Sequence, residues 1–212
     1  MRTACVLAAA AGICAFSCGS AFGVTLGQVD DFESGLTSGW FEGSPSPNPP
    51  ITATEGDNTF LRNVASGGVG GGSRQAMFNI DQWAGDYVSA GVTRVTMDVR
   101  NSGNFAITVR LAFQSFLGGR TATNDSIFLA AGSGWETVTF DLLDQTLVEN
   151  TDSLLDTLTR VQQMRIVASA EPDFRGDPIP STLDVDNIRA LPSPGAAALL
   201  ALGAVAAGRR RR

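Results

Sequence analysis

Apolar and polar residues alternate most clearly in the middle of the chain. Every second residue from Val95 to Val99 is apolar, and after a break at positions 101–104 every second residue from Phe105 to Phe113 is apolar. A period of two places one face of an extended strand in the core and the other toward solvent. The break, Asn-Ser-Gly-Asn, is typical of a turn. The pattern predicts two strands that pair as an antiparallel hairpin with one buried face.

Shorter segments of the same kind predict eight more strands, at positions 29–32, 39–42, 59–64, 75–78, 126–130, 135–142, 163–169 and 183–188. One short helix is expected at 152–160, where leucines share a face and Thr151 or Asp152 is placed to cap it. The proline-rich segment 43–50 and the glycine-rich segment 66–75 are expected to be loops. Many short strands with little helix indicate an all-β fold, an antiparallel β-sandwich (jelly roll).

The N-terminal segment, residues 1–23, has the layout of a signal peptide. Arg2 precedes an apolar run at 6–16, and small residues stand three positions and one position before a cut ahead of Val24. A lipoprotein signal with lipid attached at Cys18 is the alternative. All three cysteines precede the expected cut, so the exported chain would contain neither a thiol nor a disulfide.

The C-terminal segment, residues 192–212, resembles the PEP-CTERM sorting signal of bacterial exoproteins. It has a proline-containing motif, a short apolar run at 195–208 and a basic end; the motif is Pro192, Ser193 and Pro194, and the basic end is Arg209, Arg210, Arg211 and Arg212. Serine stands where the namesake motif has glutamate. The resemblance implies cleavage by an exosortase-type enzyme and release or attachment at the cell surface.

The same run is short for a permanent membrane anchor. At a rise of about 1.5 Å per residue it would span roughly 21 Å, less than the hydrocarbon core of about 30 Å. We therefore expect a transient insertion of this sorting helix, with the arginines on the cytoplasmic side. The sandwich domain would then occupy residues 24–191.

Charge and composition narrow the chemistry. The chain has no histidine and no lysine, and its body has 10 arginines against 21 acidic residues, a formal charge near −11. Such a body disfavours nucleic acid and would attract cations such as calcium, although acidity alone also keeps an exported protein soluble. Ser–His–Asp and Cys–His catalysis, the usual zinc sites and a lysine Schiff base are excluded. A carboxylate pair for glycoside hydrolysis is the catalytic option that remains, and among so many acids it has no specific signal.

Two acidic segments suggest a calcium site. The sequences "DDFESG" (30–35) and "LDVDNI" (183–188) lie near the two ends of the predicted sandwich, whose terminal strands are expected to be neighbours. The acids that would converge are Asp31, Glu33, Asp184 and Asp186. Calcium takes six to eight oxygen ligands, which carboxylates and backbone carbonyls at strand ends supply. The alternative is that these acids face solvent.

Aromatic residues suggest a sugar-binding site. In "NIDQWAGDYVSAG" (79–91), Trp83 and Tyr87 lie among polar residues including Asp86, which is the composition of a surface that stacks and hydrogen-bonds a sugar ring. Packing at the edge of the core is the alternative. Trp40 and Trp135 each follow a glycine at the start of a strand and are expected in the core.

The body is also similar to galactose-binding-like and carbohydrate-binding-module jelly rolls, through "DFESG…GW" (31–40), "WETVTFDL" (135–142) and "LDVDNI". It also resembles sandwich domains of PEP-CTERM exoproteins through residues 83–101. The resemblance implies a structural Ca²⁺ between the terminal strands, which maps to Glu33 and Asp186.

Three functions are left open by the sequence. The first is an exported, surface- or matrix-associated, non-catalytic sandwich that binds extracellular polysaccharide. The second is a structural or adhesive surface protein without a sugar pocket, which full burial of Trp83 and Tyr87 would favour. The third, less favoured, is a glycosidase or lyase.

Overall fold

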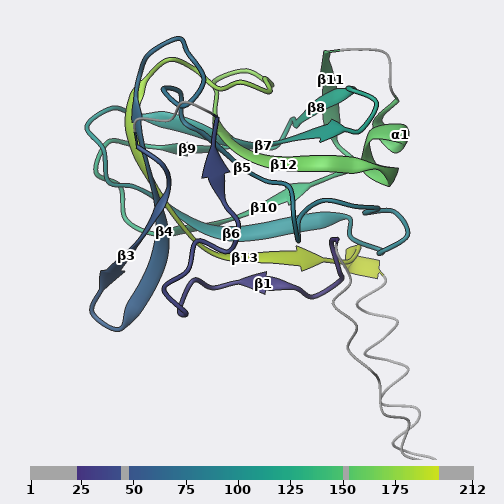
Figure 1. Cartoon of the computed structure of the whole chain (residues 1–212), viewed down its shortest axis with the longest axis horizontal. Coiled ribbons are helices and arrows are strands. Elements are labelled where there is room, and N and C mark those ends of the chain that lie inside the picture. The colour runs from purple at the N-terminus through teal and green to yellow at the C-terminus, as the bar shows by residue number, and fades with distance from the viewer. Residues whose placement is uncertain (1–22, 44–47, 150–152, 196–212) are drawn as a thin grey trace, which may run out of the picture.

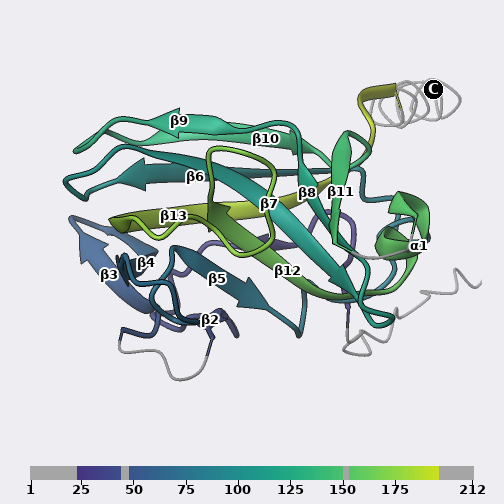
Figure 2. The same cartoon turned by 90° about the horizontal axis from the view of Figure 1, so that it is seen from above.

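A computed structural model describes residues 23–43, 48–149 and 153–195, which form two antiparallel sheets packed face to face (Figures 1 and 2). Sheet A contains, in spatial order, β10 (Glu136–Asp141), β6 (Arg94–Asn101), β13 (Pro180–Leu191), β4 (Asn58–Ser66) and β3 (Ile51–Glu55), with β1 (Val29–Asp30) paired to β13. Sheet B contains β11 (Gln145–Glu149), β8 (Arg120–Thr123), β7 (Ile107–Ser115), β12 (Val161–Ala168), β5 (Ala76–Asn79) and β2 (Phe41–Glu42), with β9 (Ile127–Leu129) paired to β7. The predicted antiparallel β-sandwich is confirmed.

The core lies between the sheets and is built by the predicted alternation. Val95, Met97 and Val99 on β6 are fully buried, as are Leu111 and Phe113 on β7, while the residues between those of β6 are half-buried on its outer face. Because each sheet buries one face, the outer faces are free to carry polar side chains.

The predicted hairpin between β6 and β7 is wrong. Both strands form where expected, but β6 pairs with β10 and β13 in sheet A, while β7 pairs with β8, β9 and β12 in sheet B. The alternation of apolar residues reports which face of a strand is buried, and two strands that face each other across a core satisfy it as well as two neighbours do.

A buried asparagine holds the connection between β6 and β7. The Asn101 side chain is fully buried; its Nδ2 donates to the carbonyls of Phe105 (2.8 Å), Leu129 (3.2 Å) and Ala130 (3.1 Å), and its Oδ1 accepts from the amide of Gly103 (3.0 Å). Gly103 lies so close to β13 that a Cβ there would come within 2.7 Å of the Thr182 nitrogen. This polar network carries the chain from one sheet to the other.

Short strands form at all eight other predicted places, but β3, β8 and β11 were not predicted. β3 and β11 lie at sheet edges and have no alternation in burial, because both faces are partly exposed. The helix α1 (Leu154–Thr159) is capped by Ser153, whose Oγ accepts from the amide of Asp156 at 3.1 Å. The caps proposed from sequence at positions 151 and 152 lie outside the described residues.

The predicted pairing of the terminal strands is confirmed. β1 runs antiparallel to β13, with Val29 opposite Arg189 and Asp30 opposite Ile188. β13 also lies between β6 and β4, so this late strand forms the middle of sheet A. Residues 1–22 of the expected signal peptide (1–23) and residues 196–212 of the expected sorting segment (192–212) lie outside the described residues. Within the described part of the chain, no helix is long and apolar enough to cross a membrane.

Candidate functional site

The aromatic pair predicted to contact sugar is buried. Trp83 and Tyr87 have no exposed surface; the Tyr87 hydroxyl donates to the Trp83 carbonyl (2.8 Å), and its ring packs edge-on against Phe113. Asp86 is half-buried and accepts from the amide and the hydroxyl of Ser89, which closes a local turn. The sugar-contact hypothesis for these residues is therefore wrong, because polar neighbours in the sequence concealed two rings that fill the core.

Trp83 instead belongs to a buried group centred on Asp30. The Oδ2 of Asp30 accepts from the indole Nε1 of Trp83 and of Trp40, both at 2.8 Å, and Gln82 Nε2 lies 3.2 Å from the same oxygen. Burial raises the pKa of Asp30 above its ordinary value, although the indole and amide donors act in the opposite direction. This carboxylate joins three segments of the chain and has a structural role. Trp40 is 2% exposed and lies in the core, as predicted.

Trp135 is more exposed than predicted. It was expected in the core, but 37% of its surface is exposed. Its ring meets Phe60 edge-on, with centroids 5.2 Å apart, and the guanidinium of Arg100 lies 4.7 Å from its centroid. Trp135 immediately precedes β10, at the edge of sheet A, where one side of the ring remains open.

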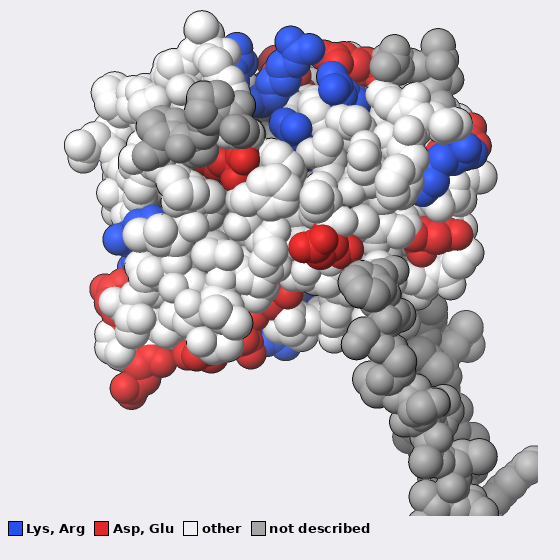
Figure 3. Space-filling view, in the orientation of Figure 1, with Lys and Arg blue, Asp and Glu red and all other residues white. Residues whose placement is uncertain are grey.

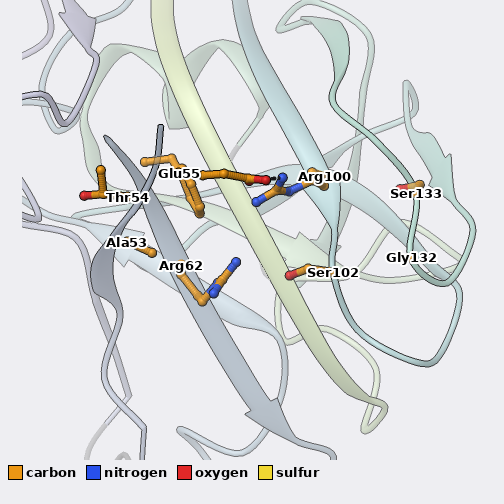
Figure 4. A pocket seen from close by; sticks show the side chains of 9 residues that line it. Ala53, Thr54, Glu55, Arg62, Arg100, Ser102, Gly132 and Ser133 are labelled. Atoms are coloured by element: carbon orange, nitrogen blue, oxygen red, sulfur yellow. Dashed lines mark hydrogen bonds and ion pairs between the residues drawn. The ribbon is translucent and has the colours of Figure 1, made fainter. Parts of the chain in front are cut away.

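Arg100 connects this tryptophan to an open groove on the outer face of sheet A (Figure 4). The groove encloses about 520 Å³, a volume typical of small-ligand sites. Residues from β3, β4, the end of β6 and the loop before β10 line it: Ala53, Thr54, Glu55, Phe60, Arg62, Arg100, Ser102, Gly132 and Ser133.

Two arginines of the groove are held by one buried carboxylate. Arg62 pairs with both oxygens of Asp184, through Nε (2.7 Å) and Nη2 (2.9 Å), and Arg100 Nη2 lies 2.9 Å from Oδ2. Asp184 is fully buried in the middle strand, and its hydrogen bond raises the pKa of Arg62. Both guanidiniums are therefore charged and fixed in orientation before any ligand arrives.

The groove also contains an exposed acceptor. Glu55 is 67% exposed and meets Arg100 Nη1 at 2.6 Å, which Figure 4 shows as a dashed line. Fixed guanidinium donors, a carboxylate acceptor, serine hydroxyls and a nearby half-open indole form a set that hydrogen-bonds sugar hydroxyls and stacks on a sugar ring. Among the described residues that line the groove, Glu55 is the one carboxylate.

The predicted calcium ligands are only partly brought together. Glu33 and Asp98 lie near enough to Asp186 for their charges to act on it, whereas Asp184 is committed to the arginines. Glu33 accepts from the amide of Thr59 (3.2 Å), and Asp31 accepts from the amide of Glu33 (3.3 Å). In the described ranges, no three acidic side chains are grouped as ligands of one metal ion. The calcium site stays a prediction, carried by Glu33 and Asp186.

Replacing Asp186 with asparagine should raise the free energy of unfolding at pH 7. Burial, followed by the charges of Asp98 and Glu33, raises the pKa of Asp186 above its unfolded value. The protonated acid therefore stabilises the fold below about pH 3.8, and this stability is lost as the pH rises through the folded-state pKa. Asparagine stays neutral, so urea unfolding should show a gain that is present at pH 7 and disappears toward pH 3. A variant less stable than wild type at pH 7 would contradict this sign.

The same variant serves to test for calcium. If Glu33 and Asp186 bind Ca²⁺, added CaCl₂ raises the Tm of the wild type, EGTA reverses the rise, and Asp186→Asn does not respond. Equal Tm values with CaCl₂ and EGTA in the wild type would exclude stabilisation by calcium.

Comparison with known proteins shows a likeness in fold. No protein-family model matches the chain, and no curated protein matches it in sequence. The likeness is to carbohydrate-binding modules. The family 11 module of a cellulosomal cellulase from Clostridium thermocellum superposes with a TM-score of 0.52 at 13% identity, over 80% of this chain and 96% of the module. At this identity the likeness establishes the fold alone.

Two further structures agree with that fold. A family 28 module described as specific for non-crystalline cellulose matches with a TM-score of 0.50 at 19% identity, over 80% of this chain and 97% of the module. An exo-β-agarase matches with a TM-score of 0.53 at 14% identity, but this chain spans 25% of that enzyme. The fold therefore occurs in carbohydrate-binding modules and as part of an agarase.

Most of the groove could not be predicted from the sequence. Arg62 and Arg100 stand at outward positions of alternating strands, and that signal was present. What the sequence lacks is the pairing of Asp184 with arginines that precede it by 122 and 84 positions.

Proposed function

We propose that this chain is an exported, non-catalytic polysaccharide-binding domain whose groove on sheet A contacts the sugar. The observation that carries the proposal is the array of Arg62, Asp184 and Arg100, prepositioned beside the half-exposed Trp135 in an open groove. The likeness in fold to modules named for carbohydrate binding supports the same function. The single lining carboxylate favours binding over hydrolysis.

Replacing Trp135 with alanine tests the groove. We expect affinity electrophoresis in soluble β-glucans and galactans to show retardation of the wild type. The variant should lose about 2 kcal/mol of binding free energy, roughly 30-fold in Kd, the effect of removing an aromatic side chain that contacts the ligand beside the groove. Phe128→Ala is the matched control, because Phe128 is 67% exposed on β9 in the other sheet. Glu55→Gln removes the charged acceptor and leaves Trp135 in place, so comparing the two variants separates the contribution of hydrogen bonding to the binding free energy from that of stacking.

A structural or adhesive surface protein without a sugar pocket is the second candidate, and the burial of Trp83 and Tyr87 favours it. Absence of retardation in every glycan, with a folded protein, would select this function. Retardation that survives Trp135→Ala and Glu55→Gln together would place the sugar site elsewhere.

Export and sorting are part of the same proposal. The sequence Pro192-Ser193-Pro194 follows β13 directly, and Arg94 donates to the carbonyl of Pro192 (3.0 Å), which supports a boundary between the sandwich and the proposed sorting segment at this point. An exosortase-type enzyme would act just beyond the domain. Mass spectrometry of the protein recovered from the cell surface or the medium should show loss of residues 1–23 and of the arginine end; a full-length mass would contradict the proposal.

A further inference from the structure

Sheet B carries a second, smaller pocket at the opposite side of the sandwich, and its chemistry differs from that of the groove. It encloses about 180 Å³ and is lined by three arginines, apolar side chains and glycine backbone: Arg74, Arg165, Arg175, Ala76, Phe78, Val69, Gly43, Gly71 and Gly72. The volume is below the roughly 300 Å³ at which typical ligand pockets begin. The pocket therefore suits one charged group or a side substituent more than a length of polymer.

Arg165 forms the base of this basic pocket. Its guanidinium lies between the rings of Phe78 (4.8 Å to the centroid) and Phe174 (3.8 Å) on the outer face of β12. It donates to Gln163 Oε1 and to the carbonyl of Phe174, and no carboxylate of the described residues lies within ion-pair distance of it. Burial, together with the charges of Arg120 and Arg175, lowers its pKa to about 10, so it remains a cation at neutral pH.

The surrounding charges leave the pocket positive. Glu149 is shared between Arg120 and Arg175, while Arg74 is held by the backbone carbonyls of Val69 and Gly176. The four guanidiniums of Arg74, Arg120, Arg165 and Arg175 thus outnumber the two carboxylates that act on them, those of Glu149 and Asp173, on a body whose formal charge is near −11. Figure 3 shows several basic side chains along the upper edge of the molecule, with acidic side chains beside them. A positive site on an acidic protein indicates a ligand that carries negative charge.

The glycine-rich loop shapes one wall of the pocket. A Cβ on Gly43 would come within 3.4 Å of the Gly72 nitrogen, and one on Gly67 would meet Pro180 at 2.5 Å. Gly43 and Gly67 therefore let the chain pack closely on its neighbours, and Gly71 and Gly72 bring backbone into the lining where side chains would fill the space.

We propose that the basic pocket binds the carboxylate of a uronic acid residue in an acidic polysaccharide. The planar guanidinium fork matches a carboxylate in two parallel hydrogen bonds, and the exposed Arg175 (61%) lies at a lining position where it can exchange Glu149 for a ligand. This inference rests on the proposed function in one respect: it assumes that the carboxylate belongs to a polysaccharide.

The test compares polygalacturonate with its fully methyl-esterified form, which has the same rings without charge. Affinity electrophoresis of the purified full chain at 0.15 M NaCl screens the general repulsion by the acidic body, and EGTA removes bridging by calcium. The wild type should be retarded by the acidic polymer and much less by the ester. Arg175→Gln should weaken binding to the acid about tenfold.

Arg189→Gln is the matched control, since it removes the same charge from an exposed position on sheet A, and it should bind as the wild type does. Retardation in neutral β-glucans and galactans, which carry no carboxylate, reports on the groove alone, so failure of the groove and failure of the basic pocket are distinguishable. Equal binding of both polymers by the wild type, or equal weakening by Arg175→Gln and Arg189→Gln, would overturn the proposal. Sodium sulfate that competes better than sodium galacturonate at equal ionic strength would overturn the assignment to a carboxylate.

Discussion

Replacing Asp30 with alanine is expected to lower the free energy of unfolding by about 4 kcal/mol. The Asp30 carboxylate is the common acceptor for the indole groups of Trp40 and Trp83. Alanine would leave two donors without partners in the core, and unpaired buried donors cost more than the hydrogen bonds themselves contribute. For a domain of this size the loss corresponds to roughly 10 °C in Tm.

Asp31→Ala is the matched control, because the neighbouring carboxyl is exposed and a substitution there should change stability by less than about 0.5 kcal/mol. Asp30→Asn keeps an acceptor oxygen and should be intermediate. Urea unfolding followed by tryptophan fluorescence measures all three. If Asp30→Ala and Asp31→Ala have the same midpoint, the buried carboxylate does not organise the two indoles.

Replacing Asn101 with alanine should cost about 3 kcal/mol, the second large effect. The side chain donates to three carbonyls and accepts from one amide at the passage from β6 to β7, and alanine would remove all of these hydrogen bonds, while the Ala130 carbonyl keeps the Ser133 amide as a donor. Besides a lower Tm, we expect faster hydrogen exchange at the Gly103 amide, which reports on this connection directly.

Asn104→Ala, at an exposed position in the same connection, controls for any change of turn sequence. It should leave both the Tm and the exchange of Gly103 close to wild type. Unchanged exchange at Gly103 in Asn101→Ala would contradict the network as the cause.

The sequence predicts strands better than it predicts their partners. β6 and β7 lie where the alternation places them, yet they belong to different sheets, because a period of two reports burial and carries no information about the neighbour. Pairing of β1 with β13 was predicted from the fold expected of a jelly roll, which does contain that information. The edge strands β3 and β11 bury neither face consistently and give no such signal.

Function was harder to predict for the same physical reason. The sequence neighbours of Trp83 suggest an exposed ring, but it is buried, and those of Trp135 suggest a buried ring, but it is partly exposed. The exposure of a ring depends on which distant segment of the chain covers it. Trp83 is covered by segments that meet at Asp30, and Trp135 lies at a sheet edge where one side of the ring has no cover. Likewise, Asp184 resembles a metal ligand in "LDVDNI" until two arginines from other strands are placed beside it.

The central position of β13 affects the order of folding. Until residues 180–191 are available, β4 and β6 have no partner between them, and sheet A consists of two separate halves with open edges. Local pairing cannot substitute, since the contacts of β13 reach back more than a hundred residues to β4. We therefore expect the nascent chain to stay unfolded until almost all of it has been synthesised. An unfolded chain can be threaded across a membrane, so late folding would be compatible with export.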